Sequence, residues 1–406
     1  MRILFLNPFH GGSHAAVAEG YARHSRHDIT LMSLPIAGGW RWRMRGAAVT
    51  LARMLRARVG DEETSRQAHE RQIEAVAWSP PHPVTVSGYD LILATDMLDL
   101  ATFLGLTRDL TAGVPVALYF HENQLTYPLP AGRQRDLAFP WINYTGALAA
   151  DALLFNSGFH RRAFLDALPG LLGRYHDHRE LDLVEGIAAK ARVLPPGIEL
   201  SRLDREGQGT RDLGFVGQTS AQAPSPKPLA PAILWNSRWE YDKGPEAFFA
   251  ALRELDARGV DFRVIVAGEH VDPNEPNFLA ARADLGERAL AWGYAPDTAA
   301  YAARLRQADI VVSTAIQEFF GIGVVEAMYC GCAPILPRRL SYPELLPPEH
   351  HAACLYDGHD DLVDKLAAAI GDLPALKARD FRGVAAQYDW SRMAPRYDEV
   401  MEDLAR

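Results

Sequence analysis

The segment from Ile310 to Gly331 reads IVVSTAIQEFFGIGVVEAMYCG and decides the fold of its half of the chain. A short apolar strand ends in a loop, and Gly321 and Gly323 then open an apolar helix. A strand that leads through a glycine turn into a helix starts a β-α-β unit, and the free N–H groups at the helix start favour an anion. We therefore expect a phosphate-binding turn, where both glycines let the backbone approach the ligand.

Two carboxylates flank this turn, Glu318 on the loop and Glu326 about one turn into the helix. Beside an anion-binding helix start they make little sense for phosphates alone, but they suit the hydroxyl groups of a sugar, from which they can accept hydrogen bonds. The alternative is one solvated acid and one helix-capping acid, which any junction between a loop and a helix could have. This segment alone leaves both interpretations open.

Segments of strand and helix length alternate on both sides of this turn. The expected strands are 2–6, 27–34, 89–94, 114–120, 152–156, 232–235, 262–267 and 310–313, with the clearest helices at 14–24, 245–257 and 301–307. This alternation predicts an α/β protein of two Rossmann-like domains, with parallel sheets that face an interdomain cleft. The expected bounds are 1–200 and 232–389 for the domains, 201–231 for a flexible linker rich in Gly, Pro, Ser and Gln, and 390–406 for a C-terminal helix.

The composition excludes several classes of protein. A formal net charge of -9 disfavours a non-specific nucleic-acid binder, so any contact with nucleic acid must rest on a local basic patch. Three cysteines without paired spacing indicate a reducing compartment rather than a disulfide framework. There is no run of about 18 apolar residues and no signal peptide at the start, so we expect a cytoplasmic protein without integral membrane association.

A second segment, WNSRWEYDKG at 235–244, follows another expected strand and places Arg238 and Lys243 on one loop. Two cations beyond a strand end can bracket a diphosphate, and they stabilise the charge that develops when a diphosphate leaves. The alternative is a surface pair whose charges are neutralised by Glu240 and Asp242.

The two motifs together, R-x4-K after a strand and E-x7-E further on, resemble the GT-B glycosyltransferases of the large retaining family 4. The resemblance covers roughly residues 190–390. It implies a nucleotide-diphosphate sugar as co-substrate, retention at the sugar carbon, and a final helix that crosses back to the first domain. It assigns catalytic roles to Arg238 and Lys243 at the diphosphate and to Glu318 at the sugar ring, and donor-binding roles to Glu326, at the ribose, and to Gly268, Gly321 and Gly323. No strand end offers the D-x-D spacing of a metal-dependent sugar transferase, so we expect no metal and no cofactor.

The first half carries several unusual strings, NPFHGGSH at 7–14, WRWRMRG at 40–46, ATDMLDL at 94–100 and YFHENQLTYP at 119–128. Together they resemble the tRNA-queuosine mannosyltransferases over most of residues 1–200. This resemblance implies GDP-mannose as donor and the cyclopentenediol of queuosine in tRNA as acceptor. Two alternatives stay open: a different nucleotide sugar with a small-molecule or lipid acceptor, and a non-catalytic module that binds a nucleotide sugar or RNA.

Polar residues at the expected strand ends of the first half are the other candidates. His121 follows the strand VALYF, and the family resemblance implies that it lies near the hydroxymethyl group of the sugar, so it is our fourth catalytic candidate. Gly11 and Gly12 lie in the first β-α turn, where close backbone approach to a phosphate is expected of a donor-binding turn. The acceptor candidates near these strand ends are His14, Asp96 and Asn123.

The strip from Trp40 to Arg45 alternates aromatic side chains with Arg41, Arg43 and Arg45. Guanidinium groups and aromatic rings suit a phosphate backbone with an unstacked base, so these arginines are acceptor candidates for tRNA. The alternative is the start of an amphipathic helix, with tryptophan packed on the core and arginine solvated.

Overall fold

The computed structural model describes residues 1–36, 39–70, 88–129, 132–174, 176–204, 230–268 and 276–406. The chain forms two compact units, one of Met1–Ile198 with Trp390–Arg406 and one of Glu199–Asp389. The linker expected at 201–231 lies outside the described residues from 205 to 229. Its described first residues belong to a short 3-10 helix, η1 (Leu200–Leu203), in the second unit.

The first unit is built on a parallel sheet of six strands in the order β2-β1-β3-β4-β5-β6. Its strands are β1 (Arg2–His10), β2 (Asp28–Pro35), β3 (Leu91–Thr95), β4 (Val116–Phe120), β5 (Ala152–Phe155) and β6 (Ala191–Val193). Its helices are α1 (Gly12–His24), α2 (Trp40–Glu70), α3 (Leu100–Leu106), α4 (Arg108–Thr111), α5 (Ala138–Ala149), α6 (Gly158–Leu172), α7 (Leu183–Ala189) and α17 (Trp390–Ala405).

Both faces of this first sheet are buried, which explains its strands of almost continuous apolar residues. Successive side chains of a strand point to opposite faces, so Ile3 and Phe5 pack into the core shared with α1 and α17. Leu4 and Leu6 pack into the opposite core, which includes residues of α2, α3, α5 and α6.

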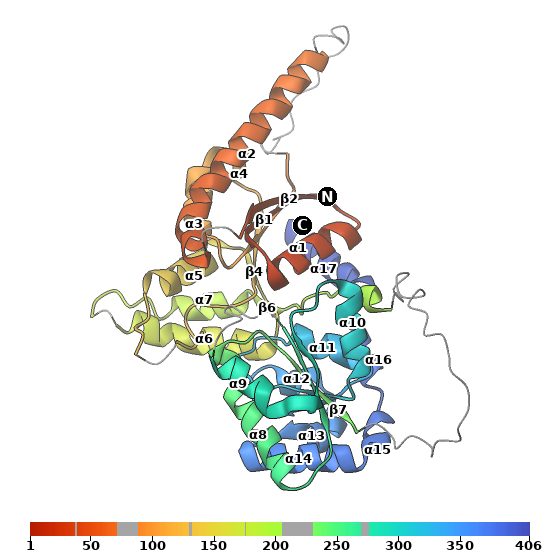
Figure 1. Ribbon diagram of the computed structural model, residues 1–406. Coiled ribbons are helices and arrows are strands. Elements are labelled where there is room, and N and C mark those ends of the chain that lie inside the picture. The colour runs from red at the N-terminus through yellow and green to blue at the C-terminus, as the bar shows by residue number, and fades with distance from the viewer. Residues whose placement is uncertain (37–38, 71–87, 130–131, 175, 205–229, 269–275) are drawn as a thin grey trace. The chain divides into compact units, whose positions relative to one another are not determined.

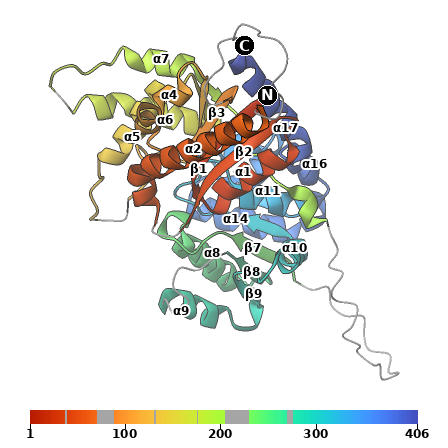
Figure 2. The ribbon, with the colours of Figure 1, turned by 90° about the horizontal axis from the view of Figure 1, so that it is seen from above.

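Helix α17 covers one face of the first sheet beside α1 (Figures 1 and 2). Met393, Tyr397 and Met401 lie on its buried side, as their helical spacing predicts. The buried Asp398 carboxylate fixes the helix further, because it accepts hydrogen bonds from the Tyr21 hydroxyl (2.9 Å), the Ser25 hydroxyl (2.6 Å) and the Arg26 backbone N–H (3.1 Å).

Helix α17 contains a proline beyond its first turn, where a proline is best tolerated. Pro395 is the sixth residue of the helix. An interior proline costs about 3 kcal/mol, whereas each large apolar side chain that becomes fully buried contributes about 1.5–3 kcal/mol. Burial of three such side chains therefore outweighs the proline.

The second unit contains another parallel six-stranded sheet, in the order β12-β11-β10-β7-β8-β9. Its strands are β7 (Ala232–Asn236), β8 (Arg263–Ala267), β9 (Ala289–Gly293), β10 (Ile310–Val312), β11 (Ala333–Pro337) and β12 (Leu355–Tyr356). Around it lie α8 (Pro245–Ala257), α9 (Pro276–Leu285), α10 (Thr298–Gln307), α11 (Ile322–Tyr329), α12 (Tyr342–Leu345), α13 (Pro348–Cys354), α14 (His359–Gly371), α15 (Leu373–Lys377), α16 (Phe381–Ala386) and the short helices η2 (Tyr241–Lys243) and η3 (Gly286–Arg288).

The two sheets confirm the predicted α/β class and the prediction that their strands run parallel. None of the helices within the described ranges has both the length and the apolar character that crossing a bilayer requires.

Candidate functional site

The loops after β7, β8 and β10 pack against one another at the carboxyl edge of the second sheet, and two glycines make this possible. Gly268 ends β8 with φ 146°, and a Cβ there would lie 2.0 Å from the Ser237 carbonyl oxygen. Gly244 has φ 62°, and a Cβ there would lie 2.5 Å from the Thr314 carbonyl oxygen. Both positions require glycine for conformation and for space. The two motifs of the second half are therefore held side by side.

Lys243 is the centre of this group. Its Nζ lies 3.3 Å from a carboxylate oxygen of Glu318 and 3.3 Å from one of Asp242, and it donates a hydrogen bond to the Gln317 carbonyl (3.0 Å). Burial lowers the pKa of Lys243, but the carboxylates of Glu318 and Asp242 raise it by more, so the net shift is upward. The lysine is a fixed, largely buried positive charge at the strand ends.

Arg238 lies on the same loop but is more open to solvent. Its guanidinium is 3.2 Å from a carboxylate oxygen of Glu240, and about half of its side chain is exposed. The ion pairs with Glu240 and Asp242 that we considered as the alternative are thus both present. Lys243 differs from a simple surface pair because it also joins the two motifs through Glu318.

The turn before α11 has the strand–loop–helix form that the sequence predicts. Gly321 has φ 106° and precedes the first residue of the helix. A Cβ on Gly323 would lie 2.9 Å from the Asn236 side-chain nitrogen, so this glycine makes room for the end of β7. The Ser341 hydroxyl donates to the Phe320 carbonyl (3.0 Å) and steadies the loop that carries Glu318.

Glu326 is buried inside a hydrogen-bond network that the sequence analysis missed. One carboxylate oxygen pairs with the Arg202 guanidinium, and the other accepts a hydrogen bond from the Tyr301 hydroxyl at 2.7 Å. The Asn236 side chain donates in turn to the Tyr301 hydroxyl (2.7 Å) and to the Gly323 carbonyl (2.9 Å). Burial and then the Glu326 charge raise the pKa of Tyr301. The network ties Glu326 to the ends of β7 and α10 and to η1.

In the first unit, His121, His14 and Asp96 come together at the carboxyl ends of β4, β1 and β3. The rings of His14 and His121 lie 4.0 Å apart between centroids, and the His121 backbone N–H donates to Asp96 Oδ1 at 2.9 Å. Burial lowers the pKa of His14 to about 3, and burial followed by the neighbouring imidazoles lowers the pKa of His121. Burial and then the Glu122 carboxylate raise the pKa of Asp96. The surroundings therefore favour the uncharged form of each group.

Several buried polar atoms of this group have no hydrogen-bond partner among the described residues. They belong to the three residues just named and to two neighbours, Asn123 and Thr95, and comprise His14 Nδ1, His121 Nε2, Asp96 Oδ2, Asn123 Nδ2 and Thr95 Oγ1. Each buried polar atom left without a partner costs about 1–3 kcal/mol, so such a concentration is unfavourable unless a ligand supplies the missing bonds. We call this set the strand-end polar group. Uncharged donors and acceptors suit hydroxyl groups.

The first β-α turn has two glycines with different roles. Gly12 begins α1 with φ 52°, and no atom of the described residues lies within 4 Å of a Cβ built on it. The space beside Gly11 is filled by Ile36, which would lie 2.2 Å from a Cβ there. Of the two glycines of this turn, Gly12 is therefore the one that the described residues leave room to approach.

The basic strip at the start of α2 requires a correction. Arg43 is buried and donates to the Pro35 carbonyl, while Trp42 is 46% exposed. These two residues depart from the amphipathic alternative, which otherwise holds because Trp40 packs on a core cluster. The burial of Arg43 removes it from any exposed phosphate-binding surface. Arg41 and Arg45 remain exposed, and Arg45 forms an ion pair with Asp136 at 2.6 Å.

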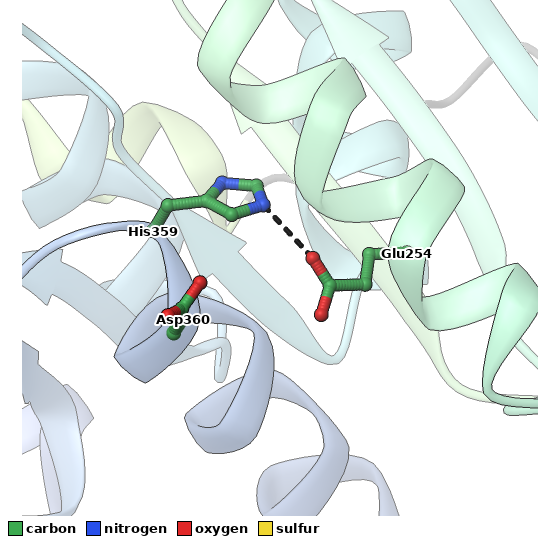
Figure 3. A group of neighbouring side chains, drawn as sticks. All are labelled: Glu254, His359 and Asp360. Atoms are coloured by element: carbon green, nitrogen blue, oxygen red, sulfur yellow. Dashed lines mark hydrogen bonds and ion pairs between the residues drawn. The ribbon is translucent and has the colours of Figure 1, made fainter.

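Within the described residues, one group of side chains has the spacing of metal ligands: Glu254, His359 and Asp360 (Figure 3). His359 Nε2 lies 3.0 Å from one Glu254 oxygen, and Arg258 is 2.6 Å from the other. Since Glu254 already bridges two groups at the surface, one of them a permanent cation, we interpret the group as an ion-pair network.

Comparisons with known proteins match both halves of the chain. Residues 2–198 match the family described as tRNA-queuosine alpha-mannosyltransferase N-terminal, and residues 221–381 match glycosyl transferases group 1. A tRNA-queuosine alpha-mannosyltransferase of Drosophila melanogaster is 32% identical over 90% of this chain and 85% of its own length. A GDP-mannose:cellobiosyl-diphosphopolyprenol alpha-mannosyltransferase of Xanthomonas campestris is 25% identical over 79% of this chain and 77% of its own.

The fold has solved counterparts. HepE of Anabaena, in complex with UDP and glucose, superimposes with a TM-score of 0.61 at 16% identity, over 99% of this chain and all of that one. This likeness and the two parallel sheets show the GT-B fold, and the match to glycosyl transferases group 1 makes the protein a glycosyltransferase, both as predicted. More particularly, the chain belongs to the tRNA-queuosine alpha-mannosyltransferase family.

Proposed function

We propose that this glycosyltransferase moves mannose from GDP-mannose to queuosine in tRNA with retention of the anomeric configuration, in the cytoplasm and without a metal. The observation that carries the proposal is the strand-end polar group, because it lies in the half of the chain that matches the tRNA-queuosine family. The names of the Drosophila and Xanthomonas relatives support tRNA-queuosine as acceptor and GDP-mannose as donor.

On the donor side, we assign Arg238 and Lys243 to the diphosphate. The three N–H groups of Lys243 are engaged by Gln317, Asp242 and Glu318, of which the Glu318 carboxylate is more exposed than that of Asp242. A diphosphate oxygen would therefore replace Glu318 at Lys243, and the released carboxylate would accept hydrogen bonds from the sugar hydroxyls.

Glu326 is proposed to bind the ribose. Each carboxylate oxygen has two acceptor positions, so Glu326 can bind a hydroxyl group while it keeps its bonds to Arg202 and Tyr301. Gly268, Gly321 and Gly323 then serve the donor indirectly, by letting the loops that carry the charged groups pack closely.

On the acceptor side, we assign the unpaired atoms of His121, Asp96 and Asn123 to hydroxyl groups of the transferred sugar and of the cyclopentenediol. Neutral imidazole can donate or accept one hydrogen bond at Nε2, and Asp96 in its neutral form can donate one. These groups would orient the two reactants without adding charge.

The proposed reaction occurs on one face of the sugar. The bond between the anomeric carbon and the diphosphate oxygen breaks, and its electron pair stays with GDP. The acceptor hydroxyl oxygen bonds to the anomeric carbon from the same face, and its proton passes to the leaving diphosphate oxygen. Arg238 and Lys243 stabilise the charge that accumulates on that oxygen, which is the role that a metal plays in other transferases.

The test is transfer by the purified protein to tRNA that contains queuosine, followed by mass spectrometry of the digested nucleosides. We expect a hexose adduct with GDP-mannose, none with UDP-glucose, none on tRNA that lacks queuosine, and undiminished activity in EDTA. Nuclear magnetic resonance of the product nucleoside should show an α linkage. A β linkage would refute retention, and transfer to unmodified tRNA would refute the acceptor.

A lipid-linked acceptor is the second candidate, because the Xanthomonas relative is named for a diphosphopolyprenol acceptor. Exposed apolar side chains on α2, Trp42, Val49 and Met54, are compatible with a membrane surface. Sedimentation with liposomes separates the two candidates: binding to vesicles without transfer to tRNA would favour the lipid.

A further inference from the structure

Helix α2 presents a continuous exposed row of basic and large side chains along one side. Residues spaced by three or four positions share one side of a helix. Trp42, Arg45, Val49, Arg53 and Arg56 follow this spacing, and Arg41 lies at the edge of the row; all six are exposed. We call these six residues the α2 row. At 1.5 Å per residue it is about 22 Å long.

The opposite side of the same helix explains why the α2 row faces outward. Met44, Ala48, Leu51 and Leu55 are fully buried, most of them in the core of the first unit, and they hold the helix in one orientation. The row is therefore a fixed surface of the first unit.

The charge of this segment differs from that of the rest of the chain. Residues 40–60 contain six arginines and neither aspartate nor glutamate, in a protein whose formal net charge is -9. A basic row on an acidic protein indicates a polyanionic partner. Such a partner would bind at this row, because the net negative charge of the chain disfavours binding elsewhere.

The arginines of the α2 row differ in how firmly they are held. Arg45 pairs with Asp136 at 2.6 Å, and since both side chains are about half exposed, a phosphate can replace this carboxylate at little cost. Arg56 is bound more firmly, because it donates two hydrogen bonds to Asp109 (2.6 and 2.8 Å) and one to the Leu106 carbonyl (2.8 Å). The described side chains offer Arg53 no carboxylate within ion-pair distance.

We propose that the α2 row binds the sugar-phosphate backbone of the acceptor tRNA, with Trp42 stacking on an unpaired base. This inference rests on the proposed function. It extends the expected tRNA contact from the strip at Trp40 to Arg45 along the helix as far as Arg56. Arginine provides planar donors for phosphate oxygens, and an exposed tryptophan beside them is the usual platform for an unstacked base. The row excludes Arg43, which is buried.

The test compares Arg41→Ala/Arg53→Ala with Arg253→Ala, which removes an exposed arginine from α8 in the second unit. We expect the double variant to raise KM for tRNA roughly ten- to thirtyfold. This corresponds to about 0.7–1 kcal/mol for each of the two lost phosphate contacts. The salt dependence of tRNA binding should become shallower by about 1.4–1.8 in log-log slope. The affinity for GDP and kcat at saturating tRNA should not change, and Arg253→Ala should match the wild type.

Trp42 supplies an independent variant. Trp42→Ala should weaken tRNA binding and Trp42→Phe should restore most of it, because a phenyl ring still stacks. The outcomes distinguish this inference from the proposed function. If the wild type modifies tRNA and the double variant does so with the same KM, the proposed role of the α2 row in tRNA binding is refuted, and the proposed function stands. If the wild type neither binds nor modifies tRNA but binds anionic vesicles through these arginines, both are overturned.

Discussion

Replacement of Lys243 by methionine tests the centre of the second unit, because it removes the charge while keeping most of the side-chain volume. The ammonium group lies 3.3 Å from Asp242, which is fully buried, and 3.3 Å from Glu318, which is about a quarter exposed. Loss of one partner from a buried pair costs about 3–5 kcal/mol, and loss from a partly exposed pair about 1 kcal/mol or less. We expect the free energy of unfolding to fall by about 3 kcal/mol, mostly from the unpaired Asp242. Glu318 adds little, because its carboxylate can turn to solvent.

The assay is thermal and urea unfolding of Lys243→Met beside Lys365→Met. Lys365 makes a looser ion pair in the same unit, 3.7 Å from the partly exposed Asp361, and donates to the Ala352 carbonyl (2.8 Å), so its loss should cost about 1 kcal/mol. For a unit of this size, about 3 kcal/mol corresponds to a fall of roughly 6–12 °C in Tm. Equal unfolding midpoints for Lys243→Met and Lys365→Met would refute the stabilising role of Lys243 beside Asp242 and Glu318.

The pH dependence of this difference has a definite sign. Burial lowers the pKa of Lys243 and the two carboxylates raise it by more, so folding raises the pKa above its ordinary value of 10.5. A cation whose pKa is raised by folding contributes stability that is fully present below the unfolded pKa and is lost as the pH rises through the folded one. The stability gap between wild type and Lys243→Met should therefore stay constant near neutral pH and shrink only above 10.5.

The same variant also separates structure from donor binding. Loss of a charged hydrogen bond to the diphosphate costs about 1.5–3 kcal/mol, or roughly ten- to 150-fold in affinity for GDP. Guanosine carries no phosphate, so its affinity should hardly change. An equal loss for GDP and guanosine, measured by calorimetry below the unfolding temperature, would show that Lys243 acts through the fold alone.

Three further changes have distinct expected outcomes. Asp96→Asn should raise Tm at neutral pH and lower transfer. Burial raises the pKa of Asp96, so the wild-type native state loses stability as the pH rises from 3.8 through the raised pKa. Thermal scans should therefore show the gain in Tm vanish below pH 3.8. Gly268→Ala should cost about 1–3 kcal/mol and reduce activity, because the added Cβ would meet the Ser237 carbonyl oxygen; urea unfolding measures this, and an unchanged midpoint would contradict the close packing. Asp398→Ala should cost about 3 kcal/mol by leaving the Tyr21 hydroxyl and two other donors unpaired, and hydrogen exchange should quicken in α1 and α17 but not in the second sheet.

Much of the fold could be predicted because its strands are apolar on both faces and are followed by turns. The strands that escaped prediction, β6, β9, β11 and β12, are short or rich in alanine, glycine and proline, and their pattern resembles that of a loop. They are strands because of their neighbours. For example, Ile335 pairs with Val312 of β10 and is fully buried, which local sequence does not reveal.

The start of α2 could be predicted only in part. One alternative for WRWRMRG was an amphipathic helix with tryptophan packed on the core and arginine solvated, and Trp40, Arg41 and Arg45 follow it. In a helix of 3.6 residues per turn, Arg43 falls on the side of Met44 and Ala47, and Trp42 falls outside it. Helix length and register, which the surrounding core determines, decide which arginines reach solvent.

The hydrogen-bond partners of the charged residues could not be predicted, because they are distant in sequence. Arg202 reaches Glu326 across 124 positions, and nothing near either residue indicates the other. Thr95, by contrast, was within reach of prediction. A hydroxyl beside Asp96 at the end of an apolar strand of a parallel sheet is a signal of the same kind as the one that drew attention to His121.

The docking of α17 on the first unit has a consequence for biosynthesis. The ribosome makes Met1–Ile198 first, yet the core of that unit also needs Met393, Tyr397 and Met401. The whole of Glu199–Asp389 must be translated in between, which takes roughly 10–40 s at about 5–20 residues per second. During this interval the apolar face of the nascent first unit beneath α17 is uncovered and open to chaperones. A nascent chain that stops before α17 leaves it uncovered permanently, so quality control can recognise incomplete copies by that face.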